Sequence, residues 1–170
     1  MRKMAALNGL EGLLVKRAAS KLDIKSLLEV LRRSGGSGGT TQAFSAKFPV
    51  SRRHLLGAYA NAMRAFSEDT NRTRSPGLEM LLYAAMTSQI KDALLIAGVK
   101  EPSDFIILSD DKRVLAKLGK VAKIGGDFDT TLPEMRRRAI SIGIDAGAMG
   151  REQIDAEVLR RMALAMLSAD

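Results

Sequence analysis

Apolar side chains recur at helical spacing in several stretches of the chain. Between Asp23 and Gly35 they follow one another at intervals of three and four, which predicts a short amphipathic helix with Asp23 as its N-cap. Similar stripes predict helices over residues 51–66 and 153–167. Each of these helices has one apolar side, so each must pack against something else.

The longest apolar segment lies in the middle of the chain. Ser75 followed by Pro76 is a typical helix start, and Gly98 is a typical stop, so the pattern predicts one helix between them. Its first part, residues 78–86, is apolar nearly all round apart from Glu79. We therefore expect it to be the central buried helix.

Strand patterns are short and few. Apolar and polar residues alternate over residues 44–48, where Pro49 ends the strand. The run FIIL at 105–108 predicts a buried strand, and residues 120–129 predict an edge strand or a loop.

The remaining elements complete an irregular alternation of helices and strands. Ser109 can cap a helix through Leu118, and Pro133 starts another helix. The stretch 34–39, SGGSGG, predicts a flexible loop; it lacks the Gly-Lys-Ser/Thr ending of a phosphate-binding loop. We expect an α+β fold with residues 1–170 in a single domain, in which several helices pack around a small mixed or antiparallel sheet.

The composition is that of a folded protein. Hydrophobic residues make up 46% of the chain and charged residues 27%, which is far from the composition of disordered chains. Because cysteine is absent, disulfides, thiolate metal sites and a cysteine nucleophile are excluded. No apolar run approaches the roughly 20 residues that span a bilayer. We expect a cytoplasmic protein without membrane contact.

Basic side chains exceed acidic ones, and the excess lies in the first half of the sequence. The chain has 27 Lys and Arg against 19 Asp and Glu, a net charge of +8. Residues 1–74 hold 14 basic and 5 acidic side chains, whereas residues 75–170 hold 13 and 14. Such an excess favours polyanionic partners, because neutralised phosphates release counterions. A solubilising surface would explain it equally well.

Patterns for catalysis and metal binding are missing from the sequence. His54 is the one histidine, and we expect a structural role for it because the positive end of a helix disfavours its charged form. The carboxylates are scattered without a recognised ligand spacing, so neither a metal nor a cofactor is predicted. The sequence therefore predicts that the protein is not an enzyme.

Arginines are the main candidates for contact with RNA. The chain has only seven aromatic residues, and none alternates with basic residues as in a base-stacking platform. Arginine forks on phosphate or on a base edge are the alternative. The candidate RNA-binding residues are Arg52, Arg53, Arg72, Arg74 and Lys91. Residues 136–138 are three further arginines, but successive residues point around a helix and cannot form one patch.

Several motifs in a fixed order resemble one protein family. The stretches are SRRHLLGAYANAMRAF at 51–66, GLEMLLYAAMTSQIKDALLIAGVK at 77–100, FIILSDD at 105–111 and IGGDFD at 124–129. Within them, His54 precedes two leucines, Glu79 precedes aliphatic residues, and the pair Gln89 and Ile90 precedes Ala93. In this order the chain resembles the kinase-binding small subunit of the archaeal and eukaryotic KEOPS tRNA-modification complex, known in eukaryotes as the PRPK-binding protein.

The chain departs from this family in one motif. Family members usually carry Ser-Gly-x-Arg-Gln-Ile, whereas residues 85–90 here read Ala-Met-Thr-Ser-Gln-Ile. Met86 stands where the family has glycine, and Ser88 stands where it has arginine. The role of that arginine must be absent here or supplied by another residue.

The resemblance implies a non-catalytic subunit of the complex that makes threonylcarbamoyladenosine in tRNA. Such a subunit binds the small atypical kinase of the complex and the CCA end of tRNA, and so serves the threonylcarbamoyl transferase subunit indirectly. The residues expected at the kinase interface are Leu94, Leu95, Ala97, Val99, Leu164 and Leu167. The alternative is a generic basic RNA- or ribosome-associated protein that has no kinase partner.

Overall fold

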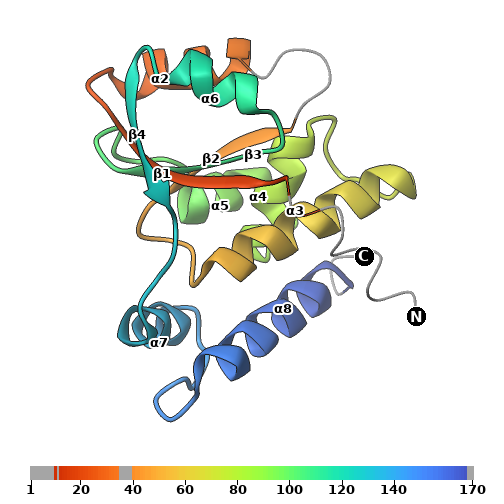
Figure 1. Cartoon of the computed structure of the whole chain (residues 1–170). Coiled ribbons are helices and arrows are strands. Elements are labelled where there is room, and N and C mark those ends of the chain that lie inside the picture. Colours follow the sequence, from red (N-terminus) through yellow and green to blue (C-terminus); the bar gives the residue numbers. More distant parts are fainter. Residues whose placement is uncertain (1–9, 11, 35–39, 168–170) are drawn as a thin grey trace.

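Four strands form an antiparallel sheet at the centre of the molecule (Figure 1). The computed structural model describes residues 10, 12–34 and 40–167. The strands are β1 (Leu14–Ser20), β2 (Thr41–Ser45), β3 (Phe105–Ser109) and β4 (Ala122–Asp127). Their order in the sheet is β2-β3-β1-β4, and each strand is antiparallel to its neighbours.

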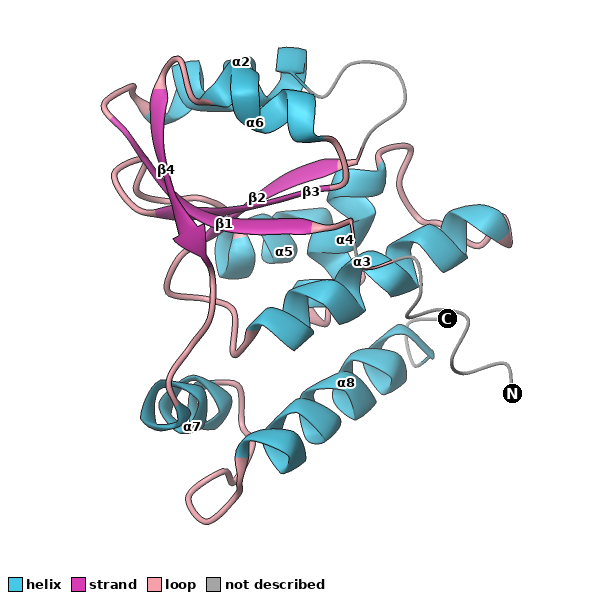
Figure 2. Cartoon of the chain, viewed as in Figure 1, coloured by secondary structure: helices cyan, strands magenta, loops and turns pink. Residues whose placement is uncertain are grey.

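Helices cover both faces of this sheet (Figure 2). The described helices are α2 (Ile24–Ser34), α3 (Arg52–Ser67), α4 (Pro76–Ala85), α5 (Ile90–Ala97), α6 (Lys112–Leu118), α7 (Leu132–Ser141) and α8 (Arg151–Leu167). Helices α2 and α6 lie on one face of the sheet, and α4 and α5 lie on the other with α3 beside them. Helix α8 packs against α3 and α4 from outside, and α7 packs against α8.

The topology consists of two interleaved crossover units. Strands β1 and β2 are parallel to each other, are joined through α2, and are separated in the sheet by β3. Strands β3 and β4 are joined in the same way through α6 and are separated by β1. This is a split β-α-β arrangement. Helices α3, α4 and α5 are inserted between its two halves.

Strand β3 has both of its faces buried. Ile106 and Leu108 point into the core shared with α3, α4 and α5, whereas Phe105 and Ile107 point into the core under α2 and α6. A strand that is covered on both sides needs apolar residues at every position. The continuous run FIIL therefore marks a central strand, as the sequence predicts.

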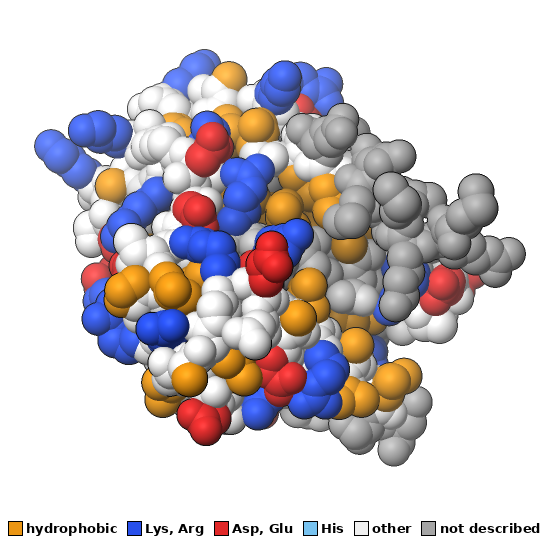
Figure 3. Space-filling model, turned by 60° about the horizontal axis from the view of Figure 1, so that its bottom comes forward, with side chains coloured by type: hydrophobic (Ala, Val, Ile, Leu, Met, Phe, Trp, Pro, Cys, Tyr) orange, Lys and Arg blue, Asp and Glu red, His pale blue; other side chains and the backbone are white. Residues whose placement is uncertain are grey.

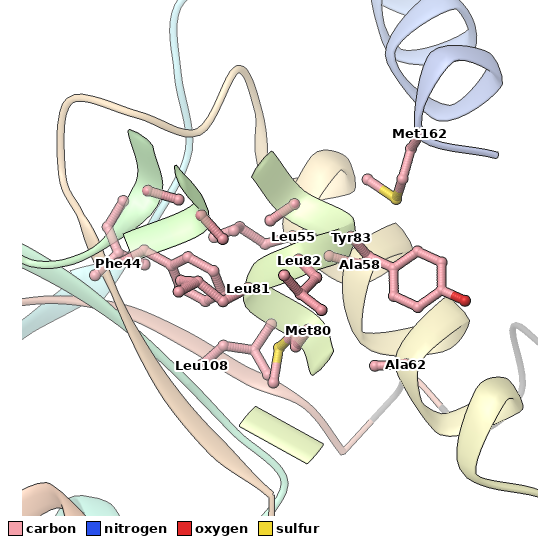
Figure 4. Close-up of a cluster of buried hydrophobic side chains, with 14 of the residues drawn as sticks. Phe44, Leu55, Ala58, Ala62, Met80, Leu81, Leu82, Tyr83, Leu108 and Met162 are labelled. Carbon is pink, nitrogen blue, oxygen red and sulfur yellow. The ribbon is translucent and has the colours of Figure 1, made fainter. Parts of the chain in front are cut away.

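Helix α4 is surrounded on all sides, which confirms the expectation of a central buried helix. Met80, Leu81 and Leu82 are each at most 1% exposed. Figure 4 shows them in one cluster with Phe44 and Leu108 from the sheet and with neighbouring α3 and α8 side chains.

The α+β fold class is confirmed, but several boundaries differ from the sequence prediction. The strand expected over 44–48 is β2, which ends at Ser45 because residues 46–48 form a turn. The cap of α6 is Asp111, whose carboxylate accepts from the Arg113 N–H, instead of Ser109. Strand β1 was not predicted. The loop expected at 34–39 lies outside the described residues except for Ser34, the last residue of α2.

The long helix expected between Pro76 and Gly98 is two helices. Helix α4 ends at Ala85, because Met86 adopts a left-handed conformation with φ 56°, and α5 begins at Ile90. The Met86 N–H still bonds back to the helix, to the Leu82 and Tyr83 carbonyls. The residues between the two helices form the motif in which this chain departs from the family.

Glu79 is the charged residue of the buried helix α4, and its role is structural. It is 0% exposed, and its Oε2 accepts hydrogen bonds from the Arg72 and Thr73 backbone N–H groups at 3.0 and 2.9 Å. Among the described residues, its Oε1 has no hydrogen-bond partner. The carboxylate therefore fixes the connector between α3 and α4 to the core.

Replacing Glu79 should destabilise the protein. In Glu79→Ala the buried Thr73 N–H and the partly buried Arg72 N–H lose their acceptor, and an unsatisfied buried group costs about 1–3 kcal/mol. We expect urea denaturation to show a loss of about 2–5 kcal/mol in the free energy of unfolding. Glu79→Gln keeps an oxygen acceptor at the same place and should lose clearly less. Equal losses in the two variants would contradict this role.

Candidate functional site

Helix α5 presents an apolar face to solvent. Ala93 and Ala97 are 0% exposed and anchor the helix to the core. The remaining aliphatic residues of the helix point outward, with these exposed fractions: Ile90 43%, Leu94 48%, Leu95 67% and Ile96 43%. An eight-residue helix that is apolar at six positions cannot bury all of them against one neighbour. Several exposed aliphatic side chains on one short helix are typical of a protein interface.

The expected kinase-interface residues on this segment divide into exposed and buried ones. Leu94 and Leu95 lie on the exposed face. Ala97 belongs to the core, and half-buried Val99 packs against the cluster under α2 and α6. Ala97 was therefore a wrong choice for a surface contact, since its side chain faces inward. Ile90 and Ile96 were missed because the sequence prediction continued α4 through this region.

The other two expected interface residues lie far from α5. Leu164 and Leu167, at the end of α8, are 48% and 75% exposed. The end of α8 contacts the segment after α3, where the Arg72 guanidinium bonds to the Met166 carbonyl. Helix α5 begins near the start of α3 instead, where His54 bonds to Ala84. Helix α3 has 16 residues and is about 24 Å long, so the two apolar surfaces are separate.

The candidate RNA-binding residues also form two groups. Arg52 and Arg53 are in the first turn of α3, and Arg53 lines a cavity of about 320 Å³ together with Ser51, Asp129, Arg151 and Asp155. Lys91 is exposed in the first turn of α5, near the same end of α3. Arg72 and Arg74 follow the other end of α3. The structure therefore does not unite the five residues.

The side chains of these basic residues differ in whether they already form a hydrogen bond or an ion pair within the protein. The Arg52 guanidinium lies 3.6 Å from the Asp127 carboxylate, and that of Arg72 donates to Met166 at 2.8 Å. The side chains of Arg53, Arg74 and Lys91 form no hydrogen bond or ion pair with any described residue. These three are the better candidates for a new contact, because an unpaired cation loses no partner on binding.

A cavity at the far end of α3 was not anticipated from the sequence. Its volume is about 650 Å³, and its lining includes Arg64, Arg72, Tyr83 and Met166. Burial and the nearby Glu79 carboxylate raise the pKa of Tyr83, so its hydroxyl stays protonated. Tyr83 gave no signal in the sequence, because it lies within a helix that is apolar nearly all round. Arg64 lies in the last turn of α3, at the other end from the candidate residues Arg52 and Arg53.

Most arginine side chains on the outer helices α7 and α8 already have hydrogen-bond or ion-pair partners, and Arg137 is the exception among the described residues. Arg160 and Arg161 both bond to Glu157, and Arg151 pairs with Asp129 at 3.2 Å. Figure 3, which brings the lower side of the molecule forward, shows basic and acidic side chains interspersed. Within residues 136–138, Arg136 bonds to Met149 and Arg138 to Ala46 and Pro49. These three arginines point in different directions, as expected.

His54 is a buried structural residue, as the sequence predicts. It is 1% exposed, its Nδ1 accepts from the Val50 N–H at 3.2 Å, and its Nε2 lies 2.9 Å from the Ala84 carbonyl. This pair of contacts requires the neutral ring with its proton on Nε2. Burial lowers the pKa of His54 to about 4, although the Ala84 carbonyl opposes this shift. His54 ties the start of α3 to the end of α4.

Met86 maintains a backbone conformation that usually requires glycine. Its φ of 56° lies in the left-handed region, where a side chain costs about 1–2 kcal/mol relative to glycine. The resemblance described above implies a glycine at this position. The turn between α4 and α5 is thus kept here without the glycine, and the Met86 side chain packs partly against two core clusters.

Residues 10, 12–34 and 40–167 contain neither a metal-ligand cluster nor a membrane-spanning helix. No three His, Cys, Asp or Glu side chains lie close enough together to hold a metal ion.

Across the same residues, no helix is both long enough and apolar enough to cross a bilayer.

The fold and its surfaces define an α+β protein that presents an apolar helix face. Residues 25–138 match the family model described as kinase binding protein CGI-121. The chain therefore belongs to this family, that of the KEOPS small subunit, as its motifs predict. A comparison with curated proteins gave no match.

The buried His54 should make stability depend on pH. Its pKa is about 4 in the folded chain and about 6.5 when unfolded. The unfolded chain thus binds more protons between these values, and stability falls as the pH drops from 6.5 to 4. We expect a loss of up to about 3 kcal/mol over this window. Urea denaturation at pH 7 and pH 4.5 measures it. The same difference in His54→Gln would exclude histidine as the cause.

The left-handed conformation of Met86 predicts that a glycine variant is more stable than an alanine variant at this position. In Met86→Gly the backbone strain disappears, whereas in Met86→Ala it remains while the same packing is lost. We expect the glycine variant to be more stable than the alanine variant by about 1 kcal/mol. Thermal and urea denaturation of the two variants provide the comparison. In a helix interior, alanine is more stabilising than glycine. A more stable alanine variant would therefore refute the left-handed conformation of Met86.

Proposed function

We propose that this protein is a non-catalytic subunit of a KEOPS complex, in the cytoplasm, that binds the small atypical kinase and recruits tRNA by its CCA end. It thereby serves the threonylcarbamoyl transferase subunit indirectly. The protein contributes contacts and no bond chemistry. Membership of a kinase-binding family supports the first contact, and the basic surface supports the second.

The apolar face of α5 carries the proposal for kinase binding. Ile90, Leu94, Leu95 and Ile96 are all more than 40% exposed, while the alanines between them hold the helix rigidly in the core. An interface core of this type is depleted in charge and rimmed by polar groups. Lys91 and Asp92 provide such a rim at the start of the helix. The end of α8, with Leu164 and Leu167, is the second candidate surface.

The RNA contact is proposed for the unpaired basic residues. Arg53 and Lys91 lie near the same end of α3, so they can act together with the α4–α5 turn. Arg74 would contact a different part of the RNA.

The absence of bond chemistry is part of the proposal. His54 uses both ring nitrogens in hydrogen bonds within the core, which leaves none for a substrate. The protein would act instead by raising the effective concentration of tRNA beside the modifying subunit, because it holds a remote part of the same RNA.

A matched pair of charge insertions tests the kinase contact. Leu94 on α5 and Leu28 on α2 are both 48% exposed, but they lie on opposite sides of the sheet. We expect Leu94→Glu to weaken binding to the KEOPS kinase by about tenfold or more, because a charge is then buried in an apolar contact. Leu28→Glu should bind like the unaltered protein. Calorimetry with purified kinase measures both affinities, and circular dichroism checks the fold.

The outcome also separates the rival functions. Equal kinase affinities for the two variants would exclude α5 and direct the search to Leu164 and Leu167. A chain that binds RNA but shows no affinity for the kinase would be the generic RNA-associated protein instead.

A further inference from the structure

Helices α2 and α6, on the face of the sheet opposite α4 and α5, form a strongly basic layer. We define the outer layer as residues 20–34 and 110–121, which contain α2 and α6 and the turns beside them. It carries eight basic and four acidic side chains, a net charge of +4, which is half of the chain's net +8. All eight basic side chains are exposed. None of these residues was among the RNA candidates in the sequence.

The acidic side chains of the outer layer are all engaged, whereas its lysines are not. Glu29 bonds to Arg32 and Arg33, and Asp111 bonds to Arg113. Asp23 caps α2 through Ser26, and Asp110 points toward α3, where it accepts from Tyr59 and the Thr40 N–H. The lysines whose ammonium groups form no ion pair or hydrogen bond with any described residue are Lys21, Lys25, Lys112, Lys117 and Lys120.

Four of these lysines converge at one end of the layer. Ser20 pairs with Ala122 in the sheet, and its hydroxyl donates to the Val121 carbonyl at 2.8 Å. This contact brings the start of α2 beside the end of α6, at the left of Figure 1. The lysine end comprises Lys21, Lys25, Lys117 and Lys120. Within residues 20–26 and 117–121 the one acidic residue is Asp23.

We infer that the lysine end is a second RNA-binding surface, which contacts the sugar-phosphate backbone. Unpaired lysines act as point charges on phosphates, and they bind without sequence preference by releasing counterions. An anionic membrane is less suitable, because the outer layer has no aromatic residue to enter the interface. The surface faces away from α5, so RNA can lie on it while a kinase occupies the apolar face.

This inference shares with the proposed function only the assumption that RNA is a partner. Two variants with the same loss of charge distinguish the two surfaces. One is Lys21→Gln with Lys117→Gln and Lys120→Gln, and the other is Arg53→Gln with Arg74→Gln and Lys91→Gln. Glutamine removes the charge, stays polar and has a helix propensity close to that of lysine and arginine. The probes are an unmodified tRNA transcript and the same transcript without its CCA end.

Fluorescence anisotropy over a range of salt concentrations gives the affinity and the salt dependence. We expect the lysine variant to bind both transcripts about tenfold more weakly at low salt. The slope of log K against log salt should fall by about 2, since each lost phosphate contact removes roughly 0.7–0.9. The arginine variant should lose affinity mainly for the complete transcript.

Three results would overturn the inference. The first is an unchanged affinity and slope in the lysine variant while the arginine variant binds weakly, which would leave the proposed function standing. The second is no RNA binding by the unaltered protein. The third is lysine-dependent sedimentation with phosphatidylserine vesicles in place of RNA binding. If only the lysine variant loses RNA affinity, the result supports the inference. It then counts against the RNA contact proposed for Arg53, Arg74 and Lys91.

Discussion

The burial of β3 on both faces is the constraint on which the other layers depend. Phe105 and Ile107 require a cover on one side, and Ile106 and Leu108 require one on the other. The two crossover helices α2 and α6 can cover only the first face, because both crossovers run over the same side. The second cover comes from α3, α4 and α5, which are inserted between β2 and β3. This insertion contains two of the four resemblance stretches, 51–66 and 77–100, and it contributes the apolar face of α5.

The insertion works because two polar groups are fixed inside it. Glu79 holds the connector between α3 and α4, and His54 holds the start of α3 against the end of α4. Both lie in the resemblance motifs, and neither is accessible to a ligand. Their place in these motifs thus follows from structure: they set the direction in which α5 leaves the core. Functional contacts are left to the exposed residues that α5 then presents.

The sequence predicted correctly those elements whose pattern depends only on neighbouring residues. The stripe over 153–167 and the caps at Ser51 and Ser75 depend on neighbours in the sequence, and the structure confirms them. Strand β1 was missed because Lys16 and Arg17 interrupt its apolar pattern, and their partners Asp127 and Asp104 lie about 90 to 110 residues away. The break at Met86 was missed because methionine rarely adopts positive φ.

Charge was informative only after the chain was folded. When charges are counted along the sequence, the basic excess lies in residues 1–74. The lysines of α6 do not show in this count, because acidic residues elsewhere in residues 75–170 offset them. In space, those acids are scattered over other surfaces or paired, while Lys117 and Lys120 lie beside Lys21 through the contact between Ser20 and Val121. Since the attraction between exposed charges is screened beyond roughly 8 Å in physiological salt, these spatial neighbours determine what the surface attracts. A polyanion would therefore meet a surface built from both halves of the chain.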